Sequence, residues 1–230
     1  MTYKAYPTWV IGFHGCDKMV FDKVIKENIH LTPSTNQYDW LGHGAYFWEN
    51  NPLRAYEFAL EQKQRGRINE PKVIGAFLDL GRCLDLTDMY SLVQLRSFFP
   101  NLKADCEARD KQLPKNKIVK NGEILFRNLD CAMIEFLHST NESISSDFRN
   151  QRHEDASTAS QNLIDQFRPY DSVRGAFIEG EPLYPGAALY EKNHIQICIR
   201  NTQCIKGYFN PLIDVGKEYT EIRNKMNIPI

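Results

Sequence analysis

The segment Gly42-His43-Gly44-Ala45-Tyr46-Phe47-Trp48 limits the possible folds of this chain more than any other stretch. Its small residues, followed by three aromatic residues, predict a short strand with one open side. About thirty residues earlier, residues 8–13 also predict a strand, and a histidine and a glycine follow it directly. An aspartate after them is a suitable N-cap for a helix over residues 17–28. The chain is therefore expected to begin with a strand, a helix and a second strand.

Apolar runs along the rest of the chain predict one mixed α/β (α+β) domain over residues 1–230. No linker divides it, and 42% of its residues are hydrophobic, which is enough for one core. Further helices are expected over residues 50–65, 87–99 and 129–137, and further strands over residues 73–80, 173–178, 194–199 and 203–209. This order lacks the regular βαβ alternation of a doubly wound sheet.

Two polar stretches form an expected insertion or mobile region around residues 100–165. Pro100 is expected to end the helix before it. Residues 103–120 are rich in lysine and arginine, which is typical of a solvated face, with a local substrate patch as the alternative. Residues 139–161 are rich in serine and asparagine and predict a long or mobile loop.

Composition excludes several classes of partner. The formal net charge is −1 and the isoelectric point is about 6.6, which gives no global attraction to nucleic acid or to an anionic membrane. No apolar run is long enough for a membrane span, and no signal-peptide pattern is present, so a soluble, cytoplasmic protein is expected. The six cysteines form no C-x-x-C pair, which favours reduced core thiols over disulfides or zinc. No metal site is expected.

His14, Gly15 and Tyr46 are the candidate ligand-binding residues of these segments. A histidine can hold a ribose hydroxyl by hydrogen bond, and a tyrosine ring can stack on a flat heterocycle. Gly15 allows its backbone N–H and C=O to approach a planar amide closely. Each residue also has an ordinary structural explanation. Together they predict a pocket for a dinucleotide without a Rossmann fingerprint.

The segments Phe13-His14-Gly15 and Gly42 to Phe47, with Ala55 after them, resemble the ADP-ribosyltransferase superfamily. The similarity is to the branch that includes poly(ADP-ribose) polymerases and small bacterial ADP-ribosyltransferase-like domains, whose signature is histidine, tyrosine and glutamate or a substitute. The resemblance implies a split, mixed β-sheet core of two small sheets with NAD in the cleft between them, and flanking helices.

The resemblance also implies roles for single residues. His14 would bind the adenosine ribose of NAD, and the Gly15 backbone would hold the nicotinamide carboxamide. Tyr46 would stack on the nicotinamide ring. Tyr56, or Phe58 in its place, would form the opposing wall. The loop with Ser34 and Asn36 would line the adenosine side.

The third motif departs from the family pattern, because the strand His194-Ile-Gln-Ile-Cys-Ile199 contains no acid. Gln196 is the expected substitute, and a structural cross-strand glutamine is the alternative. Glutamine can orient a ribose hydroxyl but cannot act as a general base. Glu179 and Glu181 could supply an acid or contact the acceptor, or be solvated turn charges. Glu191 is a third candidate.

The expected activity is mono-ADP-ribosyl transfer from NAD to a protein or nucleic-acid acceptor, with release of nicotinamide and without polymer formation. By analogy, the resemblance implies a toxin, effector or phage-conflict role and an inhibitory partner protein. Two alternatives stay open. One is a catalytically inactive module that binds NAD or ADP-ribose, and the other is an NAD glycohydrolase.

Overall fold

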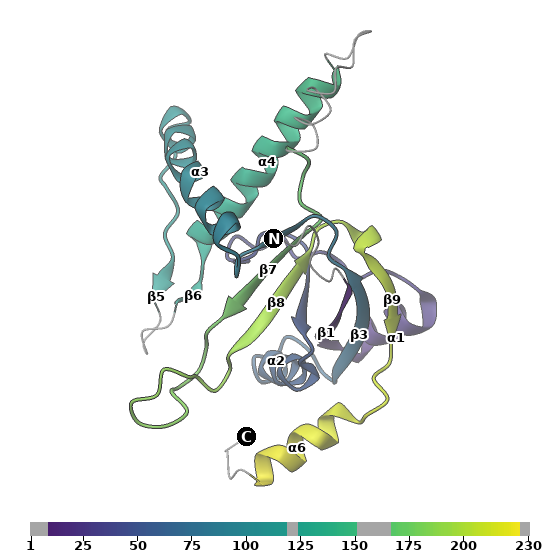
Figure 1. The fold of residues 1–230 in the computed structure, drawn as a ribbon. Coiled ribbons are helices and arrows are strands. Elements are labelled where there is room, and N and C mark those ends of the chain that lie inside the picture. Colours follow the sequence, from purple (N-terminus) through teal and green to yellow (C-terminus); the bar gives the residue numbers. More distant parts are fainter. Residues whose placement is uncertain (1–8, 119–123, 151–166, 226–230) are drawn as a thin grey trace, which may run out of the picture.

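The computed structural model describes residues 9–118, 124–150 and 167–225. Its centre is a seven-stranded mixed sheet of order β4-β7-β8-β2-β1-β3-β9, in which only β4 and β7 pair in parallel (Figure 1). Its strands are β1 (Trp9–Asp17), β2 (Ala45–Glu49), β3 (Pro71–Asp79), β4 (Cys83–Asp85), β7 (Ser172–Phe177), β8 (His194–Ile199) and β9 (Ile205–Phe209). A second ladder joins β5 (Lys117–Ile118) and β6 (Ile124–Phe126). The helices are α1 (Lys18–Glu27), α2 (Pro52–Gln64), α3 (Met89–Ala108), α4 (Asn128–Asn150) and α6 (Val215–Lys225), with a 3-10 turn over Thr202–Cys204. The expected mixed α/β class is confirmed.

The sheet is nearly divided between β1 and β2. Strand β1 pairs with β3 along its full nine residues. Its ladder with β2 contains only Gly12↔Glu49 and Phe13↔Trp48. The sequence predicted two separate small sheets, whereas the described strands form one hydrogen-bonded sheet that this short ladder joins. The short ladder matters because the two strands separate beyond it.

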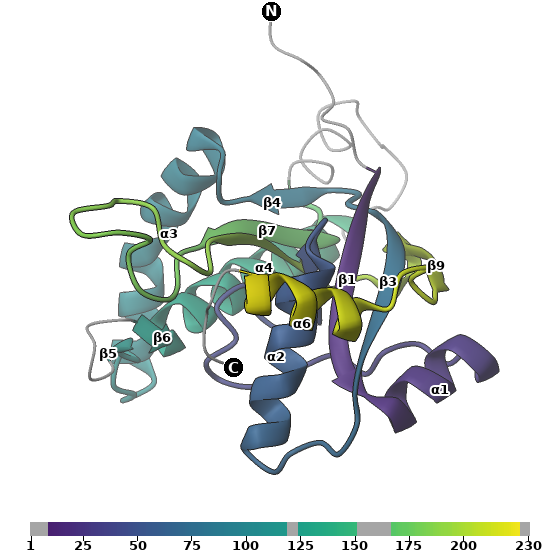
Figure 2. The same cartoon turned by 90° about the horizontal axis from the view of Figure 1, so that it is seen from below.

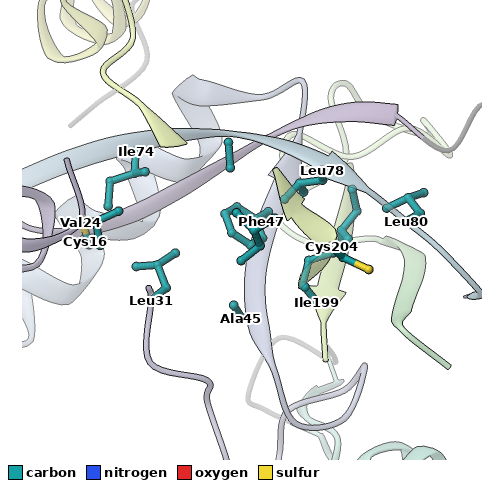
Figure 3. Packing of buried hydrophobic residues seen from close by; sticks show 13 residues of the cluster. Cys16, Val24, Leu31, Ala45, Phe47, Ile74, Leu78, Leu80, Ile199 and Cys204 are labelled. Carbon is teal, nitrogen blue, oxygen red and sulfur yellow. The ribbon is translucent and has the colours of Figure 1, made fainter. Parts of the chain in front are cut away.

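Phe47 is the centre of the main core (Figure 3). It is fully buried among residues of β3 and β8, including Leu78 and Ile199. A Cβ on Gly12 of β1 would come within 2.6 Å of Leu78 and 2.8 Å of Phe47, so the ring occupies the space that this glycine leaves. Burial of such a ring contributes about 2–3 kcal/mol. This packing fixes β2, whose alternate residues Tyr46 and Trp48 face the other side of the sheet.

The helices next to the site begin close to the predicted residues. Asp17 caps α1 and accepts a hydrogen bond from the Met19 N–H at 2.9 Å, as the sequence predicted. For α2 the expected N-cap was Asn50, but Asn51 takes that role and accepts from the Arg54 N–H at 2.9 Å. Figure 2 shows α2 lying across the sheet below β1.

Helices α3 and α4 correct two sequence predictions. Pro100 lies inside α3 instead of ending the helix. A proline inside a helix costs about 3 kcal/mol. Leu95 and Phe98 of α3 pack against the buried cluster that contains Ile134 and Leu137 of α4, and this packing offsets the cost. Helix α4 continues to Asn150 through part of the predicted loop 139–161, because His138 and Asn141 extend its buried face. Residues 151–161 of that prediction lie outside the described residues.

The basic stretch after residue 103 is largely a solvated face. Lys103 pairs with Glu107 at 3.8 Å and Arg109 with Asp105 at 2.9 Å, both at i, i+4 spacing on α3. Residues 119–120 of this stretch lie outside the described residues. Among the described helices, none has the length and apolar character needed to cross a membrane.

Candidate functional site

A cavity of about 670 Å³ opens where β1 and β2 separate. Its walls come from β1, β2 and the loop before it, one face of α2, the end of β6, the end of β7 and the middle of β8. This volume is within the range of small-molecule sites, about 300–1,000 Å³. The aromatic side chains on its walls are Tyr38, Trp40, Tyr46, Trp48, Phe58, Phe126 and Phe177. The cavity is therefore suited to a ligand with flat rings.

The backbone of Gly15 lacks a strand partner on its β2 side. The N–H of Asn50 donates to the carbonyl of Ile11 at 2.9 Å, so odd-numbered residues of β1 direct their polar groups toward β2. The ladder ends at Phe13, two residues before Gly15. A Cβ on Gly15 would lie 1.9 Å from the Ala55 carbonyl oxygen, so its lack of a side chain also lets α2 pack directly on β1. Gly15 itself does not line the cavity as its neighbour His14 does.

The imidazole of His14 ends the ladder. Its Nδ1 lies 2.7 Å from the carbonyl oxygen of Tyr46. Because a carbonyl only accepts, Nδ1 carries the proton, and Nε2 is left as an acceptor. Burial lowers the pKa of His14, and the Tyr46 carbonyl opposes this only in part. His14 is therefore neutral at pH 7 and presents an acceptor in a residue that lines the cavity.

Tyr46 contributes its ring to the cavity, while its hydroxyl holds the fold. The hydroxyl donates to the Gly42 carbonyl at 2.8 Å and accepts from the Leu41 N–H at 3.0 Å. Burial raises the pKa of Tyr46 well above its ordinary value. The phenol therefore stays neutral and closes the turn before β2. Ligand contact is left to the ring.

Gln196 lies at the centre of the sheet face that forms the cavity floor. It pairs in register with Trp48 of β2 and Gly175 of β7. The absence of a side chain at Gly175 makes room for Trp40, whose ring would lie 2.7 Å from a Cβ there. The indole N–H of Trp40 donates to Oε1 of Gln196 at 2.6 Å. With its oxygen bound in this way, Gln196 presents its NH₂ group, a donor, as the free end of the amide.

The loop before β2 forms the wall that the sequence assigned to the adenosine side. Ser34 and Gly44 exchange backbone hydrogen bonds of 2.8 and 3.0 Å, which ties this loop to the start of β2. The hydroxyl of Ser34 accepts from Nδ2 of Asn36 at 2.8 Å. Both side chains line the cavity.

Arg54 is the most buried cation on the cavity wall, with 6% of its side chain exposed. Its Nη2 donates to Glu179 at 2.7 Å, and its Nη1 lies 3.5 Å from Glu61 and 3.6 Å from Glu57. Burial acts to lower the pKa of Arg54, and these carboxylates outweigh it, so the pKa is raised. Nε and Nη1 make no hydrogen bond within the described structure. Arg54 is thus a fixed charge with unused donors.

Three predicted residues lie away from the cavity. Tyr56 is on the opposite face of α2 from Phe58, where it packs edge-on against Tyr219 of α6 with ring centroids 5.6 Å apart. Strand β7 ends at Phe177, so Glu179 and Glu181 do not continue it on one face as the sequence suggested. Glu179 lines the cavity, whereas Glu181 and Glu191 are exposed.

Sequence reasoning missed Trp40, Arg54 and Phe177. Trp40 and Phe177 pack with ring centroids 5.2 Å apart, and the Arg127 guanidinium lies over both rings at 5.0 and 4.4 Å. The helical spacing of Arg54, Phe58 and Glu61 places them on one face of α2, a signal that the sequence does contain. Nothing local marks Trp40 or Phe177, because the sheet brings them together.

The described residues contain no group of three or more histidine, cysteine or acidic side chains that could hold a metal ion. All six cysteines are free, as expected. Comparison with known proteins adds no name to this site: no family model, no curated protein and no solved structure matches the chain.

Proposed function

We propose that this protein is an ADP-ribosyltransferase that uses NAD and releases nicotinamide. One observation carries the proposal. The imidazole of His14 takes the Tyr46 carbonyl, so the backbone of Gly15 has no β2 partner, directly after a residue that lines the aromatic cavity. A carboxamide, which offers one acceptor and one donor in a plane, complements a backbone N–H and C=O. Nicotinamide is an aromatic ring that carries such a carboxamide.

The remaining contacts suit the rest of NAD. The neutral Nε2 of His14 would accept from a ribose hydroxyl, and Tyr46 and Phe58 would enclose the nicotinamide ring. Arg65 and Arg67 line the cavity near the end of α2 and are available to the diphosphate. The proposal includes the ADP-ribosyltransferase fold that the sequence resembles. The short β1–β2 ladder at the centre of the sheet supports it.

In the proposed transfer, a nucleophile on the acceptor attacks C1′ of the nicotinamide ribose. The C1′–N bond breaks, its electron pair leaves with nicotinamide, and the proton of the acceptor is lost to a base. Gln196 would orient the ribose through its NH₂ group but cannot take that proton. Of the three sequence-predicted acids, Glu179 lines the cavity, and the hydrogen bond from Arg54 at 2.7 Å holds its carboxylate in place. We therefore assign the carboxylate role to Glu179.

The test is nicotinamide release and NAD binding by the purified protein. Replacing His14 by Ala should weaken NAD binding or turnover by about 2–4 kcal/mol, because a positioned contact is lost. The exposed His30 offers a matched control, His30→Ala, which should change neither. Unchanged NAD binding in His14→Ala would contradict the proposal.

Gln196→Glu tests the third motif. A carboxylate at this position should stabilise the positive charge that develops on the ribose and raise NAD hydrolysis. Gln203→Glu, in the 3-10 turn, is the control for an added charge. A folded Gln196→Glu protein with no faster hydrolysis would show that this side chain does not contact the ribose.

Gln196 itself favours one alternative, a module that binds NAD or ADP-ribose without turnover, because its oxygen is already bound by Trp40. In that case nicotinamide is never released, and Gln196→Ala changes affinity only. Release that continues with NAD as the sole substrate would instead identify a glycohydrolase. The toxin-like role and the inhibitory partner stay predictions.

A further inference from the structure

Trp40 holds the side-chain amide of Gln196 in one orientation. The indole Nε1 of Trp40 lies 2.6 Å from Oε1 of Gln196. An indole N–H can only donate, whereas an amide has an accepting oxygen at one end and a donating NH₂ group at the other. The oxygen must therefore turn toward Trp40. Within the part of the chain that the structure describes, the NH₂ group makes no hydrogen bond, so it is left for a ligand in the cavity.

The indole of Trp40 is itself held in place. A Cβ on Gly175 would come within 2.7 Å of its ring, so the ring rests directly on the backbone of β7. The ring of Phe177 packs against it with centroids 5.2 Å apart, and the Arg127 guanidinium lies 5.0 Å from its centroid. Neither side chain can accept a hydrogen bond, so both hold the ring without competing with Gln196 for its N–H.

The fixed amide sets the polarity of the contact at the cavity floor. With its oxygen held by Trp40, Gln196 offers the ligand a donor, and the ligand group opposite must be an acceptor. A glutamate at this position would differ, because one carboxylate oxygen would bind the indole and the other would remain an acceptor. The two oxygens of a carboxylate are equivalent, whereas the two ends of an amide are not. Orientation by Trp40 therefore matters for glutamine and not for glutamate.

We propose that Trp40 is a positioning residue of this site, and that it makes the contact of Gln196 selective for a hydrogen-bond acceptor on the ligand. The inference rests on the proposed function in one respect, since a ribose oxygen of NAD would be that acceptor. Without the indole N–H, the amide is free to turn over and present its oxygen, which repels the lone pairs of an acceptor. The polarity of the third motif thus depends on a residue 156 positions away.

The first experiment is a double-mutant cycle on NAD affinity. Trp40→Phe removes the indole N–H and keeps an aromatic ring beside Phe177. It is made in the unmodified chain and in Gln196→Glu. We expect NAD binding to weaken about fivefold in the unmodified chain, as for the loss of one oriented hydrogen bond, and to stay within about twofold in Gln196→Glu.

Trp48→Phe is the matched comparison. Trp48 also lines the cavity, but its indole N–H makes no hydrogen bond within the described structure. Its replacement should therefore change NAD affinity by the same factor in both backgrounds. An equal loss for Trp40→Phe in both backgrounds would show that Trp40 only packs, which would overturn the inference and leave the transferase intact.

A measurement without NAD separates this inference from the function beneath it. In an NMR spectrum of the indole N–H groups, the Trp40 signal is the one that Trp40→Phe removes. Its N–H should exchange with solvent at least about tenfold more slowly than that of the exposed Trp9, and Gln196→Ala should abolish this protection. Protection that survives Gln196→Ala would overturn the positioning role. Absence of NAD binding in every protein would overturn the proposed function, and the exchange rates would still decide whether Trp40 positions Gln196.

Discussion

Two arginine–glutamate clusters contact the two ends of the segment that contains β2, one through His43 and the other through Trp48, and they use their hydrogen-bonding groups differently. Arg200 is bound by both oxygens of Glu135, and its Nη1 also donates to the His43 carbonyl at 3.0 Å. Glu135 accepts from the His43 N–H at 2.8 Å. This cluster therefore bonds directly to the backbone of the turn between Gly42 and Gly44.

In the second cluster, Arg54 donates its hydrogen bond to a carboxylate, that of Glu179. Nη2 of Arg54 lies 2.7 Å from Glu179, Nη1 lies 3.5 Å from Glu61 and 3.6 Å from Glu57, and the buried Nε and Nη1 make no hydrogen bond within the described structure. The same residue types thus do different work. The hydrogen bonds that the first cluster makes with the backbone stabilise a turn, whereas Arg54 holds the carboxylates of Glu179 and Glu61, which line the cavity. We expect substitutions in the first cluster to change stability, and substitutions in the second to change turnover.

Glu135→Ala should give the largest effect on stability. It removes the partner of Arg200, which is 18% exposed, and the acceptor of the His43 N–H. We expect the free energy of unfolding to fall by about 2–3 kcal/mol, less than for a fully buried pair. Denaturant unfolding measures this loss. Glu142→Ala, at an exposed position of the same helix, is the control, and an equal loss there would contradict the assignment.

Tyr46→Phe should come next. It removes the hydroxyl that donates to the Gly42 carbonyl and accepts from the Leu41 N–H. We expect a loss of about 1–2 kcal/mol in unfolding free energy, while NAD affinity stays within about twofold because the ring remains. Calorimetric unfolding and NAD titration give the two values. If affinity fell and stability did not, the hydroxyl would be a ligand contact and its structural role would be wrong.

The sequence predicted the elements with clear local signals and missed the contacts that strand order creates. Asp17 and the apolar runs placed α1, β3 and β8 to within about two residues, since caps and alternation are local. The predicted end of the first strand at Phe13 was wrong, because β1 pairs with β3 as far as Asp17 and so includes His14 and Gly15. The predicted end of the helix before Pro100 was wrong, because the packing of α3 against α4 outweighs the cost of a proline inside a helix.

The same division applies to the candidate site. His14, Ser34, Tyr46 and Gln196 were predicted and all line one cavity. Trp40 and Gln196 are 156 residues apart in the sequence. The indole of Trp40 reaches Gln196 because Gly175, the β7 partner of Gln196, has no side chain in its way. No local pattern contains that information.

Arg54→Lys tests the second cluster. Lysine keeps the charge beside Glu179 and Glu61 but loses the planar fork and its spare N–H groups. We expect nicotinamide release to fall about tenfold, equal to about 1.4 kcal/mol, with a smaller change in stability. Arg223→Lys is matched, because Arg223 also pairs with Glu57, at 3.6 Å, but does not line the cavity. If Arg54→Lys changed stability more than turnover, the Arg54 cluster would act mainly on stability, as the Arg200 cluster is expected to do.

His194, which lies beside the Arg54 cluster, gives the smallest predicted effect. Burial lowers its pKa from 6.5 to about 4, the Lys192 carbonyl opposes this, and the charges of Arg54, Glu61 and Lys192 act on it as well. The folded state therefore keeps this histidine neutral while the unfolded state binds a proton. Its contribution to stability is fully present above pH 6.5 and declines as the pH falls toward about 4. Between pH 7.5 and 5.5, His194→Asn should remove about 1 kcal/mol of the acid-induced loss in unfolding free energy. Identical pH profiles for the two proteins would show that His194 titrates normally, and that the Arg54 cluster lies in a more solvated site than its 6% exposure indicates.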